Sequence, residues 1–240
     1  MISMVRTLFF LIMLVLDTIA GTLFAMMVGL FNPYSSLNSW GMKVWAKILV
    51  WSAGVRSEIF GLERIRPGES YILVANHQSH MDIPVLVASL PLPIRIISKK
   101  ELFKIPVFGW GMRAVGILEI DRSDRKKAFE TLQKAEGIVR EHHLSILAFP
   151  EGTRSPDGKI HPFKKGPFIL AINTGLPLLP ISVSGTCNIL PKKKLRIRGG
   201  RVKIQIHPPI TTTDKSLDDR NELVKQTHEA ITAGFIENYH

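Results

Sequence analysis

The stretch that decides the fold is Tyr71-Ile72-Leu73-Val74-Ala75-Asn76-His77-Gln78-Ser79-His80-Met81-Asp82. Its first five residues form an apolar run that predicts a strand. A polar segment follows, and Pro84 is tolerated in the first turn of a helix that begins near Asp82. A strand, a polar turn and a helix in this order are typical of an α/β fold.

The polar segment places an imidazole, His77, and a carboxylate, Asp82, five positions apart. Neighbours on one helix lie three or four residues apart. We therefore expect His77 in the turn and Asp82 at the start of the helix, as a general base and the partner that orients it.

Two other interpretations of this segment remain open on these residues alone. Asp82 could be no more than a helix N-cap, and Asn76, His77 and His80 could be ordinary turn residues. A metal site through His77, His80 and Asp82 lacks further ligands, because no cysteine cluster or second histidine-rich segment accompanies it.

Downstream of residue 55, short apolar runs alternate with longer amphipathic segments, which predicts an α/β domain with a mixed, largely parallel sheet flanked by helices. The predicted strands are 56–60, 71–75, 94–98, 115–120, 145–149, 179–184 and 195–198 with 202–207. The predicted helices are 82–90, 102–113, 124–141, 165–174 and 217–236. Residues 195–204 read as a hairpin that turns on Gly199-Gly200, with one cationic face that is either solvated or attracted to anionic lipid headgroups or donor phosphates.

Composition limits the class of protein. With 240 residues and 45% apolar content, the chain can form one substantial domain plus an appendage. The single Cys187 excludes an intramolecular disulfide and suits a reducing compartment. A formal charge of +11 favours phosphate-bearing partners, namely anionic membrane, nucleic acid or phosphorylated metabolites.

The amino-terminal region favours membrane among these partners. Between Leu8 and Phe31 the only charged residue is Asp17. A helix over this run would be roughly 36 Å long, enough to cross a hydrocarbon core of about 30 Å. A cleaved signal peptide fits poorly, because the apolar run continues past Asp17 with no small-x-small site at its end. A nucleic-acid binder would explain the charge but not this segment.

A second segment, residues 40–53, has the composition of a helix at the lipid–water boundary, with Trp40, Trp45, Trp51, Lys43 and Lys47. We therefore predict a two-helix membrane anchor over residues 1–54, one helix inserted and one near the interface, followed by the α/β domain over 55–240. The alternative is a single spanning helix attached to a soluble domain.

Two further stretches carry polar residues that suit a phosphate. The predicted strand 145–149 runs into Pro150-Glu151-Gly152-Thr153-Arg154-Ser155, where the arginine is a fork-shaped phosphate binder and the glycine allows close approach of backbone amides. Residues 98–122 mix cations, glycines and aromatics, which suits a ligand with a phosphate and an alkyl chain. Each stretch could also be structural, as a turn held by Glu151 and Arg154, or as core aromatics beside solvated lysines.

Four segments in this order resemble the motifs of the glycerolipid acyltransferase family, and most closely those of its bacterial 1-acylglycerol-3-phosphate acyltransferases. The segments are 76–82, 99–122, 149–155 and 178–183. The similarity covers roughly residues 55–210, and the two preceding apolar segments resemble the membrane anchor of that group.

The resemblance implies a glycerol-3-phosphate acyltransferase-like fold and specific roles for the site residues. His77 would be the general base and Asp82 the carboxylate that orients it. The Glu151-Gly152-Thr153-Arg154 loop would bind the acceptor, with Arg154 on its phosphate and Lys100 as a second cation. Candidates for stabilising the oxyanion are Asn76 and the amides of Gly152 and Thr153. No serine nucleophile, metal or cofactor is implied, and His80 stays outside the catalytic set.

The implied reaction transfers an acyl group from acyl-CoA or acyl-carrier protein, as co-substrate, to the sn-2 hydroxyl of 1-acyl-glycerol-3-phosphate (lysophosphatidic acid), giving phosphatidic acid in phospholipid biosynthesis. The expected partners are these substrates and membrane lipids, without nucleic acid, at the cell inner membrane with the catalytic domain on the cytoplasmic side. Open alternatives are glycerol 3-phosphate, another lysophospholipid or a lyso-aminolipid as the acceptor. A further alternative is a membrane-attached lipid-binding or scaffold protein without turnover.

Overall fold

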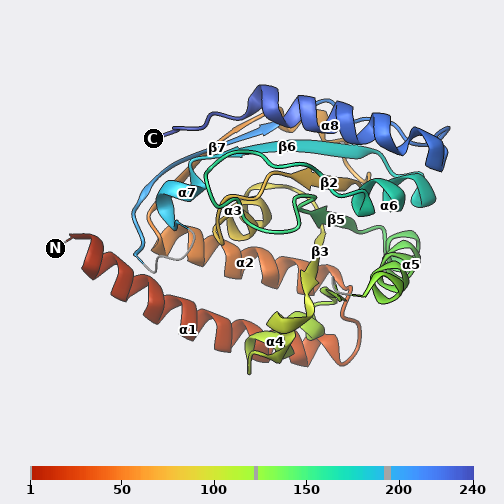
Figure 1. The fold of residues 1–240 in the computed structure, drawn as a ribbon. Helices are drawn as coiled ribbons and strands as arrows, with labels where there is room; N and C mark the ends of the chain where they lie inside the picture. Colours follow the sequence, from red (N-terminus) through yellow and green to blue (C-terminus); the bar gives the residue numbers. More distant parts are fainter. Residues whose placement is uncertain (1, 122–123, 192–195) are drawn as a thin grey trace.

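The protein is described by a computed structural model that covers residues 2–121, 124–191 and 196–240 (Figure 1). Its strands are β1 (Val55–Phe60), β2 (Ile72–Ala75), β3 (Ile94–Lys99), β4 (Leu118–Ile120), β5 (Ser145–Ala148), β6 (Leu178–Ser184) and β7 (Gly200–Ile206). Within the described residues they form one sheet in the order β1-β7-β6-β2-β5-β3-β4.

The sheet is mixed and largely parallel, which confirms the predicted fold class. Strands β6, β2, β5, β3 and β4 are parallel neighbours, whereas β7 is antiparallel to β6 and parallel to β1. The carboxyl ends of β2, β5 and β3 therefore meet at one edge of the sheet. This is the edge where ligands bind in open α/β sheets.

Helices cover both faces of this sheet (Figure 1). The α-helices are α1 (Ile2–Gly29), α2 (Ser36–Ser52), α3 (Asp82–Ser89), α4 (Phe108–Ala114), α5 (Arg125–His142), α6 (Gly166–Thr174), α7 (Thr186–Ile189) and α8 (Arg220–Gly234). Short 3₁₀ helices are η1 (Leu62–Arg64), η2 (Lys100–Lys104) and η3 (Leu217–Asp219). One core lies between the sheet and α5, α6 and α8, and the other between the sheet and α2 and α3.

Helix α1 lies along the domain and is held near both ends. In its first turns the Ser3 hydroxyl donates to the Ile197 carbonyl at 3.1 Å, and the Ile197 amide donates to the Thr7 hydroxyl at 3.0 Å. Near its other end the Thr22 hydroxyl donates to the Val107 carbonyl at 3.2 Å, beside α4. The helix therefore spans the lower side of the molecule in Figure 1, from the segment before β7 to α4.

The outer side of α1 is apolar and exposed. Its residues 3–29 have a mean hydropathy of 2.3, and they form the one described helix that is long and apolar enough to cross a membrane. Exposed large apolar side chains on this helix are Met4, Val5, Leu8, Phe9, Leu11, Ile12, Val15, Leu16, Ile19, Leu23, Met26 and Met27.

Helix α2 is amphipathic and belongs to the core as well as to the surface. Met42, Ala46 and Leu49 are buried in the core beneath the sheet, whereas Trp40 and Trp51 are exposed. The second predicted anchor segment is thus a helix with apolar residues on two sides. Its place in a membrane remains a prediction.

The tryptophans and lysines of the predicted interfacial helix do not all face the surface, which the sequence pattern did not indicate. Trp45 lies between the helices, where its ring N–H donates to the Thr18 hydroxyl at 3.3 Å. Lys43 turns inward and donates to the Leu90 carbonyl at 2.8 Å, while Lys47 is exposed.

One predicted helix is interrupted and one predicted strand is shorter than expected. The predicted helix 102–113 is broken into η2 and α4, because Val107 adopts a φ of 65° and the Phe108 amide bonds back to the Pro106 carbonyl at 2.7 Å. This three-residue turn breaks the helical hydrogen-bond pattern. The predicted strand 115–120 begins only at Leu118, because the amides of residues 115–117 bond back to carbonyls of α4 instead of to a neighbouring strand.

The predicted hairpin on Gly199-Gly200 is not formed. Residues 196–199 are not a strand, and Leu195, the first residue of that prediction, lies outside the described residues. The reason is that other partners occupy this segment: Ile197 bonds to α1, and the Gly200 amide donates to the Gly54 carbonyl at 3.1 Å. β7 then begins at Gly200 and lies between β1 and β6.

Candidate active site

His77 and Asp82 form a hydrogen-bonded pair at the carboxyl end of β2. His77 lies in the loop after this strand and Asp82 is the first residue of α3, as the spacing predicted. The Nδ1 atom of His77 is 2.7 Å from Oδ2 of Asp82, and the side chains are 16% and 0% exposed. An ionised carboxylate only accepts hydrogen bonds, so Nδ1 carries the proton and the lone pair of a neutral ring is on Nε2.

The carboxylate of Asp82 is held by three further donors. Its Oδ2 atom accepts from the backbone amides of Gln78 at 2.7 Å and Ser79 at 2.8 Å. Its Oδ1 atom accepts from the hydroxyl of Thr186 at 2.5 Å. The two amides precede Asp82 in the chain, so the carboxylate stabilises the loop 77–81 instead of capping the first turn of its own helix.

Glu151 joins the loop after β5 to the loop after β2. Its side chain is 6% exposed, and its two oxygens accept from the amides of His77 at 2.7 Å and His161 at 3.1 Å. The Ser155 amide donates to the His77 carbonyl at 2.7 Å. Burial raises the pKa of Glu151 above its usual range, against the opposing effect of these two amides. Glu151 is thus a structural link between the two polar loops, a role that the spacing of the motifs does not reveal.

The imidazole of His77 is fixed in a second direction by an aromatic ring. Phe149, the residue before Pro150, stacks on it with ring centroids 4.1 Å apart and planes 21° apart. An apolar wall on one face and a carboxylate at Nδ1 leave few orientations for the ring. The imidazole is therefore pre-oriented, as a general base would need to be.

Arg154 lies in the electrostatic field of the pair. Burial lowers the pKa of its guanidinium, and the carboxylate of Asp82 opposes this shift. A half-buried cation that interacts with the Asp82 carboxylate suits an anionic ligand at this edge of the sheet.

Gly152 turns the loop, and Lys164 covers it. Gly152 has a φ of +76°, and a Cβ built there would lie 2.8 Å from Nζ of Lys164. The Lys164 amide also donates to the Pro150 carbonyl at 2.8 Å, which places this second cation on the loop. The sequence analysis missed Lys164, although the run Lys164-Lys165 directly before α6 in a basic chain could have indicated it.

The candidates for stabilising the oxyanion differ in the hydrogen bonds that they already make. The side-chain amide of Asn76 is fully buried and exchanges two hydrogen bonds with the backbone of Val183, at 2.9 Å and 2.8 Å. It ties β2 to β6 with one N–H and its oxygen, and the role of Asn76 as an oxyanion donor remains a prediction. The Gly152 amide donates to the Phe149 carbonyl at 3.0 Å. Among the described residues no partner is recorded for the Thr153 amide, and its side chain is exposed.

Lys100 lies further from the pair than the other candidates. It follows β3, which is separated from β2 by β5, a lateral distance of about 10 Å for two strand spacings. Its ammonium is 2.5 Å from Oδ2 of Asp121, and this hydrogen bond raises the pKa of Lys100. His80 is exposed, and within residues 2–121, 124–191 and 196–240 no group of three or more His, Cys, Asp or Glu is placed to hold a metal ion.

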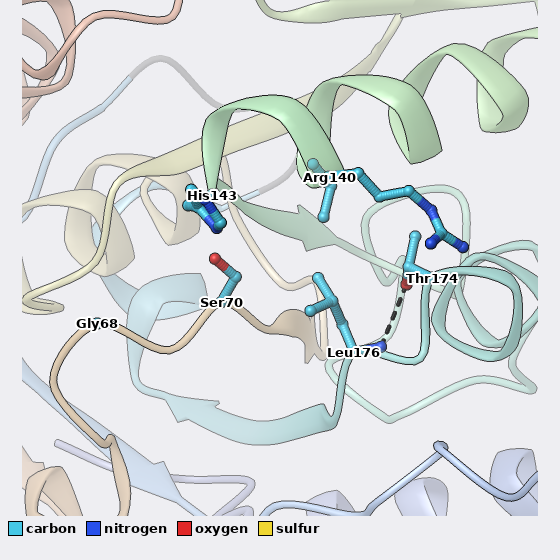
Figure 2. Close-up of a pocket in the computed structure, with 7 residues that line it drawn as sticks. Gly68, Ser70, Arg140, His143, Thr174 and Leu176 are labelled. Atoms are coloured by element: carbon cyan, nitrogen blue, oxygen red, sulfur yellow. Dashed lines mark hydrogen bonds between the residues drawn. The ribbon is translucent and has the colours of Figure 1, made fainter.

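A cavity of ≈ 300 Å³ lies at the opposite edge of the sheet (Figure 2). Its walls come from the segment before β2 and from the carboxyl ends of α5 and α6, and it contains none of the predicted site residues. The lining residues are Gly68, Ser70, Val139, Arg140, His143, Thr174 and Leu176.

Comparison with known proteins relates this geometry to a family. A family model described as Acyltransferase matches residues 56–184, more than half of the chain, from the second residue of β1 to the end of β6. A chloroplastic 1-acyl-sn-glycerol-3-phosphate acyltransferase of Brassica napus is 39% identical over 170 residues, 70% of this chain and 48% of that protein. The alpha form of this enzyme from Ovis aries is 30% identical over 184 residues, 77% of this chain and 64% of that protein. The chain thus spans only about half to two thirds of the length of these relatives.

A solved structure extends the similarity over almost the whole chain. The 1-acyl-sn-glycerophosphate (LPA) acyltransferase PlsC from Thermotoga maritima superposes with a TM-score of 0.82 at 28% identity, over 97% of this chain and 94% of that chain. The His77–Asp82 pair, the Glu151–Arg154 loop and the strands β2 and β5 that precede them all lie within the residues matched by the family model. The chain belongs to the acyltransferase family.

Proposed function

We propose that this protein is a membrane-attached acyltransferase that transfers an acyl group from a thioester donor to the free sn-2 hydroxyl of 1-acyl-glycerol-3-phosphate, giving phosphatidic acid. The donor is acyl-CoA or acyl-carrier protein, as the co-substrate. The observation that carries the proposal is the His77–Asp82 pair, linked through Glu151 to the loop that carries Arg154. This arrangement provides a base next to a phosphate-binding cation, as an acceptor with both a hydroxyl and a phosphate requires.

His77 starts the reaction by removing the hydroxyl proton. Its Nε2 lone pair accepts the proton as the acceptor oxygen attacks the thioester carbonyl carbon. The positive charge that develops on the ring is stabilised by the carboxylate of Asp82, 2.7 Å from Nδ1. Direct transfer forms no covalent enzyme intermediate, so the mechanism requires no serine nucleophile.

Collapse of the tetrahedral intermediate completes the transfer. The carbonyl oxygen carries a negative charge in the intermediate, and the Thr153 amide is the donor that we assign to it. When the C–O double bond re-forms, the C–S bond breaks, and the thiolate takes the proton back from Nε2 of His77. The products are an ester and a free thiol, and the imidazole returns to its neutral form.

The acceptor is recognised through its phosphate. Arg154 can bind a phosphate with two parallel hydrogen bonds, and Lys164 adds a point charge on the same loop. Lys100 would reach the acceptor only from the carboxyl end of β3, which is separated from β2 by β5, so we assign it a smaller contribution than Arg154.

Attachment to the membrane is proposed to occur in the plane of the interface. Because α1 is bound to the domain through Ser3, Thr7 and Thr22, it could cross a bilayer only by carrying the domain into the lipid. Its exposed apolar side, together with Trp40 and Trp51 of α2, instead suits insertion into one leaflet, with α1 parallel to the membrane plane. The site would then lie beside the lipid that holds the acceptor, on the cytoplasmic side of the inner membrane where thioester donors occur.

The experiment that tests the proposal is phosphatidate formation by the purified protein with acyl-CoA or acyl-carrier protein and lysophosphatidic acid. His77→Ala should lower kcat by about 10²- to 10⁴-fold, the usual contribution of a general base. His161→Ala is the matched control, because this histidine also pairs with an aspartate, Asp157, at 2.8 Å but lies outside the proposed machinery. Wild-type activity of a folded His77→Ala variant would refute the mechanism.

A further inference from the structure

A buried hydroxyl from a distant part of the chain contacts the carboxylate of Asp82. The Thr186 hydroxyl donates to Oδ1 of Asp82 at 2.5 Å, across 104 residues of sequence. Thr186 is 0% exposed, and it is the first residue of α7, directly after β6. It also lies beyond residue 184, where the match to the acyltransferase family model ends.

The fold directs this hydroxyl toward the catalytic loop. Gly185 turns the chain out of β6 with a φ of +94°, and a Cβ there would lie 2.5 Å from the Arg201 carbonyl, so the turn accepts only glycine without a shift of the backbone. At the other end of α7, the Leu190 carbonyl accepts from the Ser79 hydroxyl at 2.8 Å. Helix α7 is therefore bound at both ends to the loop 77–82.

The two oxygens of Asp82 have different tasks. Oδ2 accepts from His77, Gln78 and Ser79, whereas the recorded partner of Oδ1 is Thr186. A carboxylate can turn about its terminal bond, and such a turn would direct Oδ2 away from Nδ1 of His77. The hydroxyl of Thr186 opposes this turn. In the observed orientation it pairs with the buried Oδ1 atom, and a turn of the carboxylate would break that hydrogen bond and leave a buried charged oxygen without a partner.

We propose that Thr186 is a positioning residue for acyl transfer, which holds the Asp82 carboxylate in the orientation that aligns the base His77. This inference rests on the proposed function, because it gives His77 the role of the base. Thr186 itself touches neither substrate, and it acts through Asp82.

The test compares Thr186→Val with Thr186→Ser. Valine preserves the shape and removes the hydroxyl, while serine keeps the hydroxyl. We expect Thr186→Val to lower kcat by about 10- to 100-fold, the range for loss of a hydrogen bond to a charged group, with KM for both substrates nearly unchanged. We expect Thr186→Ser to stay within about threefold of the wild type.

Two buried threonines provide matched controls. Thr227 on α8 is 0% exposed and its hydroxyl has no partner among the described residues, so Thr227→Val should change neither kcat nor thermal stability by much. Thr212 donates to the carbonyls of Ala171 and Leu176, at 3.1 Å and 2.8 Å, next to the carboxyl end of α6 and away from the His77–Asp82 pair. Thr212→Val should therefore lower Tm without lowering kcat.

A double variant separates positioning from general stability. If Thr186 acts through the base, Thr186→Val should have almost no further effect on kcat in a His77→Ala background, because residues that act as a unit are not additive. Multiplicative effects, or wild-type kcat in folded Thr186→Val, would overturn the inference. Should Thr186→Val fail to fold, Thr186→Ala and Thr186→Ser provide the same comparison. An active His77→Ala variant would instead refute the proposed function, so the two failures are distinguishable.

Discussion

Asp82→Asn is the substitution that isolates the charge behind the base. The amide oxygen of asparagine can accept from His77, Gln78 and Ser79 as Oδ2 does, and its NH₂ group can donate to the Thr186 hydroxyl, which then rotates to accept. The geometry is thus preserved while the negative charge is lost. The imidazolium formed during proton transfer then has no counter-charge.

The size of the effect follows from Coulomb's law. Two unit charges about 4 Å apart interact with about 4 kcal/mol at an effective dielectric constant of about 20. If the transition state carries most of the imidazolium charge, kcat should fall by roughly 10³-fold. Because asparagine retains the hydrogen bonds, the change in Tm should remain small compared with the loss of a buried charge pair.

The assay is the rate of free-thiol release from acyl-CoA at saturating acceptor, with thermal unfolding measured on the same samples. The matched control is Asp157→Asn, which removes the carboxylate from a second His–Asp contact, with His161 at 2.8 Å on the surface. That variant should keep kcat within about threefold of the wild type, since the His161 ring is exposed to solvent and takes no part in the proposed reaction. A folded Asp82→Asn enzyme with kcat within tenfold of the wild type would show that the carboxylate supplies orientation alone.

Three other results are expected. Arg154→Ala should raise KM for lysophosphatidic acid at least tenfold but leave a phosphate-free acceptor little changed, with Arg140→Ala at the opposite edge of the sheet as the control; equal losses on both acceptors would refute the phosphate contact. The hydrogen bond from His161 is the main cause that lowers the pKa of Asp157 to about 2 from 3.8, so the stabilising contribution of this carboxylate should be present above about pH 4 and be lost as the pH falls through 2. Asp157→Asn should therefore reduce the dependence of the free energy of unfolding on pH between about 4 and 2, measured by denaturant unfolding at several pH values. An unchanged pH dependence would contradict this expectation. Leu16→Glu on the exposed side of α1 should weaken binding to anionic vesicles at least tenfold in a sedimentation assay without lowering turnover of a dispersed short-chain acceptor, and unchanged sedimentation would argue against in-plane attachment.

The parts of the fold that follow from local pattern were predictable from the sequence. The predicted strand 71–75 and helix 124–141 correspond to β2 and α5, and Asp124 caps α5 by accepting from two amides of its first turn. The separation of His77 and Asp82 between a turn and a helix start also follows from spacing alone. In each case the signal lies within one continuous stretch, where apolar periodicity and capping act directly.

The parts that depend on distant contacts were not predictable. Residues 102–113 have a helical pattern, but Val107 is held at a positive φ in a three-residue turn, where its carbonyl accepts from Thr22 of α1, and no local preference of valine indicates this. Thr186 is one threonine among many until β6 places it next to Asp82. The bonds of Glu151 to two backbone amides likewise appear only when the loops after β2 and β5 meet.

The contacts at the start of α1 have a consequence for how the chain is made. Thr7 accepts a hydrogen bond from Ile197, 190 residues later in the chain. At a synthesis rate of about 5–20 residues per second, roughly 10 to 40 seconds separate the appearance of these two partners at the ribosome. During that interval α2 can already pack on α1, but the segment that holds the first turns of α1 has not been made, and β1 waits equally for β7. We therefore expect the nascent chain to reach the membrane first and to complete its catalytic domain on the membrane surface.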